Sequence, residues 1–144
     1  MRITVIGGAG KMACISVQYL AQDPRVDEVV LADLDLDQAN VVAEYINSPK
    51  ISIQKVDVND QAGLAGLLKG SDACMNGTVY YTNLPVMEAC LSAGVHYTDM
   101  GGLFFTTHKQ LELSDPFGEA GLSAVLGIGS AARVAQLQSR SVVD

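Results

Sequence analysis

The opening of the chain, from Met1 to Ala13, is a short apolar run that breaks into closely spaced glycines. Gly8, Gly10 and Ala13 match the pattern G-x-G-x-x-G/A, and a helix-like pattern follows them. The first glycine of this pattern permits a tight turn, the second lets the backbone approach a pyrophosphate, and the small third residue lets helix and strand pack. The N-terminus of the helix then offers free N–H groups and a positive dipole end to an anion. The segment therefore predicts a dinucleotide site.

A carboxylate follows at the expected distance. The second β-type run, Asp27 to Asp33, ends 20 residues after Ala13, where such folds place the acid that binds the adenosine ribose. Asp35 and Asp37 come next, and no arginine lies close behind Asp33. Their negative charge would repel a 2′-phosphate, so the sequence favours NAD over NADP. An accidental glycine-rich turn with an acidic helix cap is the alternative, and the combination of strand, helix and acid disfavours it.

Composition limits the class of protein. With 144 residues, of which 49% are hydrophobic, the chain can bury the core of one domain. A net charge of −7 and the lack of a lysine or arginine run make nucleic acid and anionic membranes poor partners. Three cysteines in apolar surroundings, without a C-x-x-C pair, predict no disulfide framework and no metal site, and indicate a reduced, cytoplasmic setting. The apolar start is too short for a signal peptide or a membrane span.

Beyond the first strand, β-type and helix-type segments alternate with short connections, which is typical of a parallel sheet covered on both faces. We expect strands near residues 3–6, 27–33, 51–58, 73–76, 95–98 and 122–126. We expect helices over 12–23, 35–46, 64–68, 85–93 and from 107 to 121, the last with a break at Pro116. The predicted fold class is α/β, a Rossmann-type doubly wound parallel sheet in three layers, α/β/α.

The first two helices carry patterns that predict their packing. In the first helix, the stripe expected to cover the sheet consists of Met12, Ile15, Ser16, Tyr19 and Leu20. In the second, Asp35 and Gln38 have capping-box spacing. The apolar stripe of that helix consists of Leu36, Ala39, Ala43 and Ile46.

Asn76-Gly77 leaves two interpretations open. It ends the expected strand 73–76, but asparagine followed by glycine between two β-type runs is also a strong type I′ hairpin signal. Residues 82–85 look like a helix start, which would leave the returning strand very short, so the hairpin is the less favoured interpretation.

Fold geometry indicates the candidate cofactor residues, because ligands of open α/β sheets bind at the carboxyl ends of the strands. The residues expected to cradle the pyrophosphate are Gly8, Ala9, Gly10, Lys11 and Met12. We expect Asp33 to bind the ribose hydroxyls. The remaining candidates are Asp57 and Val58 beside the adenine, and Asn76, Gly77 and Thr78 near the nicotinamide ribose. Asp57 has a second interpretation, as the cap of a helix that starts near Asp60.

No residue can be given a catalytic role from the sequence. Hydride transfer is the cofactor's chemistry, and the protein adds orientation and often one acid or base. His96 lies in a β-type run and is expected to be structural, while His108 has no recognisable partner. Tyr80, Tyr81 and Asp99 lie in loops facing the expected cleft, without a spacing that defines a role. A Tyr-x-x-x-Lys pair is absent, which argues against a small short-chain-dehydrogenase-like enzyme.

Five segments carry a resemblance to a known family: Val5–Met12, Leu31–Asp33, Val56–Val58, Asn83–Gly102 and Glu119–Ser130. In this order they resemble the N-terminal cofactor domain of the saccharopine dehydrogenase and lysine 6-dehydrogenase family. The first is common to all such domains, whereas Gly94-Val-His-Tyr-Thr-Asp-Met-Gly-Gly102 is the more specific match. The resemblance implies NAD(P)-dependent oxidation or reduction at a carbon bearing an amine, usually in amino-acid metabolism. It does not imply which amino acid.

Residues 1–131 are therefore expected to form a Rossmann dinucleotide-binding domain, and residues 132–144 are a tail that departs from the family pattern. The tail is open to two interpretations, a short amphipathic helix on the sheet edge or foreign sequence from a truncated or frameshifted reading frame. Family members continue into a large substrate domain that is missing from this chain. The resemblance thus implies an oxidoreductase that acts on an amino-acid C–N bond only with a second domain or partner chain. A non-catalytic, regulatory NAD-binding module is the alternative. An apolar surface made to receive a second domain would also favour homo-oligomers.

Overall fold

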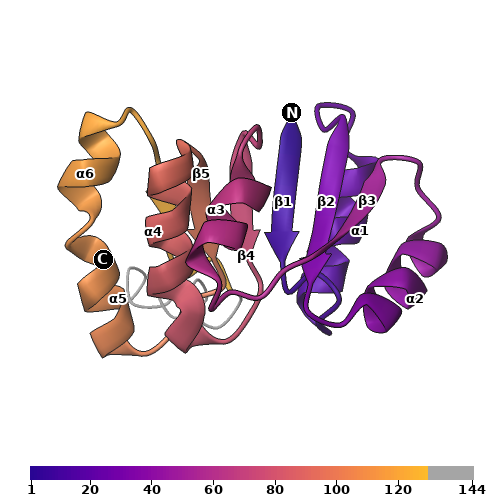
Figure 1. The fold of residues 1–144 in the computed structure, drawn as a ribbon, viewed down its shortest axis with the longest axis horizontal. Coiled ribbons are helices and arrows are strands. Elements are labelled where there is room, and N and C mark those ends of the chain that lie inside the picture. The colour runs from indigo at the N-terminus through magenta and orange to yellow at the C-terminus, as the bar shows by residue number, and fades with distance from the viewer. Residues whose placement is uncertain (130–144) are drawn as a thin grey trace, which may run out of the picture.

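The computed structural model describes residues 1–129, and its six strands form one parallel sheet (Figure 1). The strands are β1 Arg2–Ile6, β2 Glu28–Asp33, β3 Ile51–Lys55, β4 Ala73–Asn76, β5 His96–Asp99 and β6 Ala124–Val125. The helices are α1 Ala13–Gln22, α2 Leu36–Ile46, α3 Gln61–Leu68, α4 Asn83–Ala93, α5 Phe104–Leu111 and α6 Ser114–Glu119, with a 3₁₀ turn at Tyr80–Thr82. None of the helices in this part of the chain is long and apolar enough to cross a membrane.

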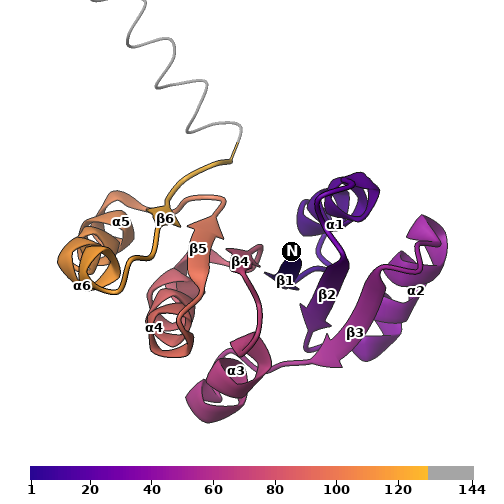
Figure 2. The ribbon, with the colours of Figure 1, turned by 90° about the horizontal axis from the view of Figure 1, so that it is seen from above.

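The strand order β3-β2-β1-β4-β5-β6 confirms the predicted doubly wound fold. The chain builds outward from β1 to β3, returns to the middle at β4, and then builds outward in the opposite direction. Because parallel crossovers are right-handed, this reversal places α1 and α2 on one face of the sheet and α3 and α4 on the other (Figure 2). The reversal lies between β1 and β4, which is where such sheets bind their ligands.

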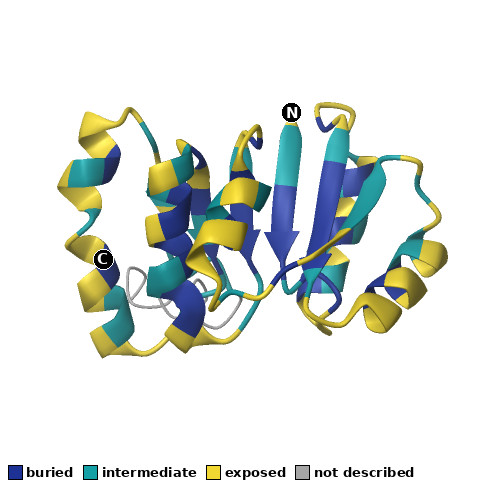
Figure 3. Ribbon diagram, in the orientation of Figure 1, coloured by how far each residue is buried: buried dark blue, intermediate teal, exposed yellow. Residues whose placement is uncertain are grey.

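Two apolar clusters, one on each face, hold the layers together. Neighbouring residues of a strand point to opposite faces, so Val5 of β1 packs with the α1 side and Ile6 with the α4 side. Both are fully buried. Figure 3 shows this burial along β1 and β2 and on the inner sides of the helices. Strands covered on both faces explain the near-continuous apolar runs of the sequence.

The face of α1 that packs on the sheet differs from the expected stripe. Its buried residues are Ala13, Val17 and Ala21, whereas Met12 and Tyr19 are 61% and 70% exposed. The prediction for this stripe was partly wrong: Leu20 packs against the core as expected and Ser16 is partly buried, but the fully covered positions carry alanine and valine instead. Met12, Ile15 and Tyr19 are left on the outer face of the helix.

The start of α2 is confirmed and its stripe is partly wrong. The Asp35 side chain accepts a hydrogen bond from the Gln38 N–H at 3.0 Å, which is the predicted cap. Ala39 is buried as expected, but its buried partner is Val42, and Leu36 is exposed.

The hairpin interpretation at Asn76-Gly77 is wrong. β4 pairs in parallel with β1 on one side and with β5 on the other, so no returning strand exists at this point. The chain turns instead into the 3₁₀ turn and α4, and α4 ends at Gly94 as expected. β3 is shorter than expected and ends at Lys55, and α5 begins earlier, at Phe104. The predicted domain boundary at 131 and the tail 132–144 lie outside the described residues.

Candidate functional site

The glycine-rich loop makes a tight turn that is held by the neighbouring strand. Gly7 has a φ of 69°, a conformation that suits glycine, and its N–H donates to the Ala32 carbonyl at 2.8 Å. The Gly10 N–H donates to the Gly7 carbonyl at 2.9 Å. The loop leads directly into α1, whose start has neither a side-chain cap nor an acidic residue in its first turn. The N-terminus of α1 therefore keeps the polarity that attracts an anion.

Asp33, at the end of β2, is tied to this loop. One of its carboxyl oxygens accepts a hydrogen bond from the Ala9 N–H at 3.0 Å, and the other accepts from the Asp35 N–H at 3.1 Å. The sequence predicted both the loop and the acid, but not the hydrogen bond that joins them. Through this bond the acid and the loop occupy a fixed mutual position.

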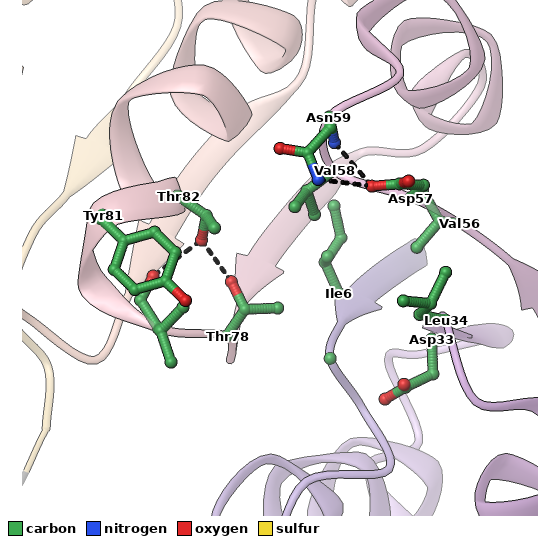
Figure 4. A pocket seen from close by; sticks show the side chains of 12 residues that line it. Ile6, Asp33, Leu34, Val56, Asp57, Val58, Asn59, Thr78, Tyr81 and Thr82 are labelled. Atoms are coloured by element: carbon green, nitrogen blue, oxygen red, sulfur yellow. Dashed lines mark hydrogen bonds between the residues drawn. The ribbon is translucent and has the colours of Figure 1, made fainter.

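A pocket of about 250 Å³ opens at the carboxyl ends of the central strands (Figure 4). Its lining residues are Ile6, Gly7, Asp33, Leu34, Val56, Asp57, Val58, Asn59, Thr78, Val79, Tyr81 and Thr82. In Figure 4, Asp33 and Leu34 lie on the opposite side of the pocket from Thr78 and Thr82. The structure thus brings four of the expected residues together in one pocket: Asp33, Asp57, Val58 and Thr78. The residues expected at the pyrophosphate, 8–12, lie in the adjoining loop rather than in the pocket wall.

Asp57 shapes the pocket wall and does not cap a helix. Its Oδ1 accepts hydrogen bonds from the backbone N–H and the side-chain amide of Asn59, both at 2.9 Å. α3 is capped by Asp60, whose side chain accepts from the Gly63 N–H at 3.0 Å. The interpretation of Asp57 as the helix cap was therefore wrong by three residues.

Asn76 organises the loop that follows β4. It is 1% exposed, and its amide nitrogen donates to Asn83 Oδ1 at 2.9 Å and to Thr82 Oγ1 at 3.3 Å. Its amide oxygen accepts from the backbone N–H and the hydroxyl of Thr78 at 3.2 Å and 2.7 Å. The hydroxyls of Thr78 and Thr82 are also hydrogen-bonded to each other. The neighbouring Gly77 lies against α1, since a Cβ added to it would stand 2.5 Å from Ala13 Cβ. Residues 76–78 are thus fixed in position by hydrogen bonds and close packing within the domain.

Asp99 is the centre of a buried polar cluster that the sequence interpretation did not find. It is fully buried at the end of β5 and accepts hydrogen bonds from the Tyr97 hydroxyl and the Gln110 side chain. Burial, together with the nearby Asp99, raises the pKa of Tyr97, so the hydroxyl keeps its proton and donates it. The available signal was the Tyr-x-Asp spacing in β5, which places both side chains on the same face of the strand.

The histidines lie apart from the pocket. His96 is structural, as expected, because its Nδ1 accepts a hydrogen bond from the Ser123 N–H at 2.9 Å. His108 is exposed and lies 4.0 Å from a carboxyl oxygen of Glu112. Residues 1–129 contain no group of three or more His, Cys, Asp or Glu side chains that could hold a metal ion.

A second, open hollow borders the pocket on the side of Asp33. Its wall contains the carboxyl groups of Asp33, Asp35 and Asp37 and a single cation, Lys55. The sheet register pairs Lys55 with Asp33, and this places the lysine at the hollow. Lys55 was not among the expected site residues. Negative charge predominates at this end of the pocket.

Comparison with known proteins agrees with this geometry. The family model described as saccharopine dehydrogenase NADP binding domain matches residues 3–125. The chain belongs to this family. The resemblance inferred from the sequence is thereby confirmed, and the chain is a dinucleotide-binding domain of the saccharopine dehydrogenase type.

Relatives of this family domain are much longer proteins. Carboxyaminopropylagmatine dehydrogenase from Synechocystis sp. is 30% identical over 137 residues, which cover 90% of this chain and 34% of that protein. Saccharopine dehydrogenase (L-Glu forming) from Saccharomyces cerevisiae matches 99% of this chain and 30% of its own, with a TM-score of 0.83 and 19% identity. An NADPH-dependent quinone oxidoreductase from Escherichia coli has a TM-score of 0.63 at 18% identity, over 86% of this chain and 46% of its own. The two structural matches show a shared fold, and the chain spans about a third of its curated relative.

Proposed function

We propose that this domain binds NAD for an oxidoreductase that acts on the C–N bond of an amino-acid-like substrate. The observation that carries the proposal is the position of Asp33. Its carboxyl group lines the pocket at the point where the strand order reverses, and it is hydrogen-bonded to the glycine-rich loop through the Ala9 N–H at 3.0 Å. An acid and a pyrophosphate-binding loop in fixed mutual geometry suit the adjacent ribose and pyrophosphate of one dinucleotide. The kind of substrate follows from the family alone, and that inference is by association.

In the proposed arrangement, some of the expected residues contact the dinucleotide and others support the loops that do so. The pyrophosphate lies along residues 8–12 at the N-terminus of α1. Asp33 accepts hydrogen bonds from the ribose hydroxyls, because a carboxylate can accept further hydrogen bonds beside the two from the backbone N–H groups of Ala9 and Asp35. Asp57 and Val58 flank the adenine. Thr78 faces the nicotinamide ribose, while Asn76 and Gly77 support the loop that carries it.

Charge supports NAD rather than NADP as the partner of this particular chain. The hollow beside Asp33 contains three carboxyl groups and one lysine, Lys55. A 2′-phosphate placed there would carry close to two negative charges at neutral pH. Repulsion from three carboxylates outweighs attraction to one exposed cation, so the 2′-hydroxyl of NAD is the better fit.

Activity requires more than this domain. The ionisable residues of the pocket wall are Asp33, Asp57 and Tyr81, without a histidine or lysine. In line with the family, we assign the proton donor or acceptor for an amine substrate to a second domain or partner chain. The same observation favours a non-catalytic, regulatory NAD-binding module as the second candidate. We further propose self-association through exposed apolar side chains such as Phe104 and Phe105, which are 74% and 76% exposed. The three free thiols support a reducing, cytoplasmic setting.

The test is isothermal titration of the 144-residue chain with NAD and with NADP. We expect NAD to bind more tightly than NADP. Asp33→Ala should lower the affinity for NAD by about tenfold or more, as expected for the loss of a charge-assisted hydrogen bond. Asp37→Ala is the matched control, since it removes a carboxyl group of the same hollow that makes no hydrogen bond to the loop. It should leave NAD affinity nearly unchanged and strengthen NADP. Tighter binding of NADP by the parent chain would overturn the NAD preference, and binding of neither by the folded chain would overturn the proposal.

A further inference from the structure

Asp99 has two carboxyl oxygens that serve different parts of the molecule. Oδ2 accepts from the Tyr97 hydroxyl at 2.9 Å and from Gln110 Nε2 at 2.7 Å, which connects it to β5 and α5. Oδ1 accepts from the Gly101 N–H at 2.8 Å and from the Gly127 N–H at 2.9 Å. One oxygen is therefore fixed to the body of the domain, and the other holds two loops that are far apart in sequence.

The two loops held by Oδ1 pack backbone against backbone. Gly101, after β5, has a φ of 102°, and a Cβ added to it would lie 3.2 Å from Gly127 Cα. The Ile128 N–H also donates to the Asp99 carbonyl at 2.9 Å. No side chain separates the loops, so the Asp99 carboxyl group is the acceptor that they share.

A continuous series of hydrogen bonds connects this arrangement to the dinucleotide pocket. Asn83 Nδ2 donates to the Gly101 carbonyl at 3.3 Å, and Asn83 Oδ1 accepts from Asn76 at 2.9 Å. The Asn76 side chain in turn holds Thr78, which lines the pocket. The loop after β4 therefore rests on the loop after β5, and Asp99 fixes the loop after β5.

We propose that Asp99 is a positioning residue for the nicotinamide half of the bound dinucleotide. The inference rests on the proposed function. A doubly wound sheet binds one mononucleotide on each of its halves. Asp33 and the glycine-rich loop belong to the half built from β1 to β3, whereas Asp99 orders the loops of the half built from β4 to β6. Loss of the Asp99 carboxyl group should loosen the second half and leave the first intact.

The experiment compares two ligands on the same variants by isothermal titration: NAD, which needs both halves, and ADP, which needs only the first. Asp99→Ala should lower the affinity for NAD by about tenfold, since two loop N–H groups lose their acceptor, and should change the affinity for ADP by less than about twofold. Asp99→Asn should restore most of the NAD affinity. Its amide oxygen can still accept hydrogen bonds from both glycine N–H groups. Its NH₂ can donate to Gln110 Oε1, a buried atom without a hydrogen-bond partner, once the Gln110 amide turns over.

Tyr97→Phe is the matched control, because it removes one hydrogen bond to the same carboxyl group and one to the Asn83 backbone carbonyl, while both glycine N–H groups keep their acceptor. It should lower thermal stability and keep the ratio of NAD to ADP affinity. If Asp99→Ala does not fold, Gly101→Ala disturbs the loop from the backbone side, at a φ that an alanine side chain rarely adopts, and should show the same selective loss of NAD.

Equal weakening of NAD and ADP, or an unchanged NAD affinity, would overturn the positioning role while leaving the proposed function intact. If the folded parent chain binds neither ligand, the proposed function fails and the role of Asp99 fails with it.

Discussion

Replacing Gly77 by alanine should destabilise the domain by forcing α1 away from the sheet. A Cβ at this position would stand 2.5 Å from Ala13 Cβ and 3.2 Å from the Ile6 carbonyl oxygen. Neither contact can be relieved by rotating a side chain, because both atoms are fixed to the backbone. Overpacking of this kind costs about 1–3 kcal/mol of unfolding free energy. The displaced N-terminus of α1 should also bind NAD less tightly.

The assay is urea denaturation, with Gly66→Ala as the matched control. Gly66 lies within α3, and apart from its chain neighbours and the surrounding helix backbone no atom lies within 4 Å of the position of an added Cβ. Alanine there should stabilise the domain by about 0.5–1 kcal/mol through helix propensity. Combining Gly77→Ala with Ala13→Gly removes the clash, so the double variant should be more stable than the sum of the two single effects predicts. Additive effects, or a Gly77→Ala variant as stable as the parent, would refute the close-packing argument.

Two further predictions concern stability away from the pocket. Asp60→Ala removes the cap of α3, a helix weakened by two internal glycines, and should lower the unfolding free energy by about 0.5–2 kcal/mol in the same assay. The side chain and backbone N–H of Arg25 hold the pKa of Asp23 well below its ordinary value. Its folded-state pKa is thus lower than its unfolded one, so the ionised form stabilises the fold above about pH 4 and this contribution is lost at lower pH. Asp23→Asn should therefore reduce stability at pH 7, and the difference from the parent chain should shrink as the pH falls from 4; a difference that grows on acidification would contradict the reasoning.

The parts of the fold that were predicted correctly depend on local chemistry. The glycine turn before α1, the Asp35 cap of α2 and the stop of α4 at Gly94 each need only a few neighbouring residues. Alternation of apolar runs then indicated the parallel sheet and its layers. Because the acid at the end of β2 and the glycine-rich loop both belong to the first βαβ unit, this half of the site could also be inferred from spacing.

The errors arose where contacts with distant segments of the chain, rather than the local sequence pattern, determine the structure. The outer face of α1 has the same helical spacing as the inner one, and the close packing of Ala13 against Gly77, 64 residues later in the chain, could not be inferred from the helix alone. Asparagine followed by glycine favours a hairpin in isolation, but β4 is enclosed by two parallel neighbours. Asp99 was ambiguous for the same reason: two of its partners, Gln110 and Gly127, lie 11 and 28 residues away.

The sheet register explains why these distant residues act at one place. Ile6 is paired with Asn76, and Asn76 is paired with Asp99, so the three residues lie side by side at the carboxyl edge. Asn76 and Asp99 are fully or almost fully buried, and each satisfies its polar atoms with the loops that leave the edge. Buried polar groups of this kind require their partners in a defined geometry, since an unpaired group would be costly. The two side chains therefore order the loops of one half of the site, whereas the other half depends on the backbone turn at Gly7 and on Asp33. Changes to Asn76 or Asp99 should consequently weaken binding of one half of the dinucleotide, and changes to Gly7 or Asp33 should weaken binding of the other half.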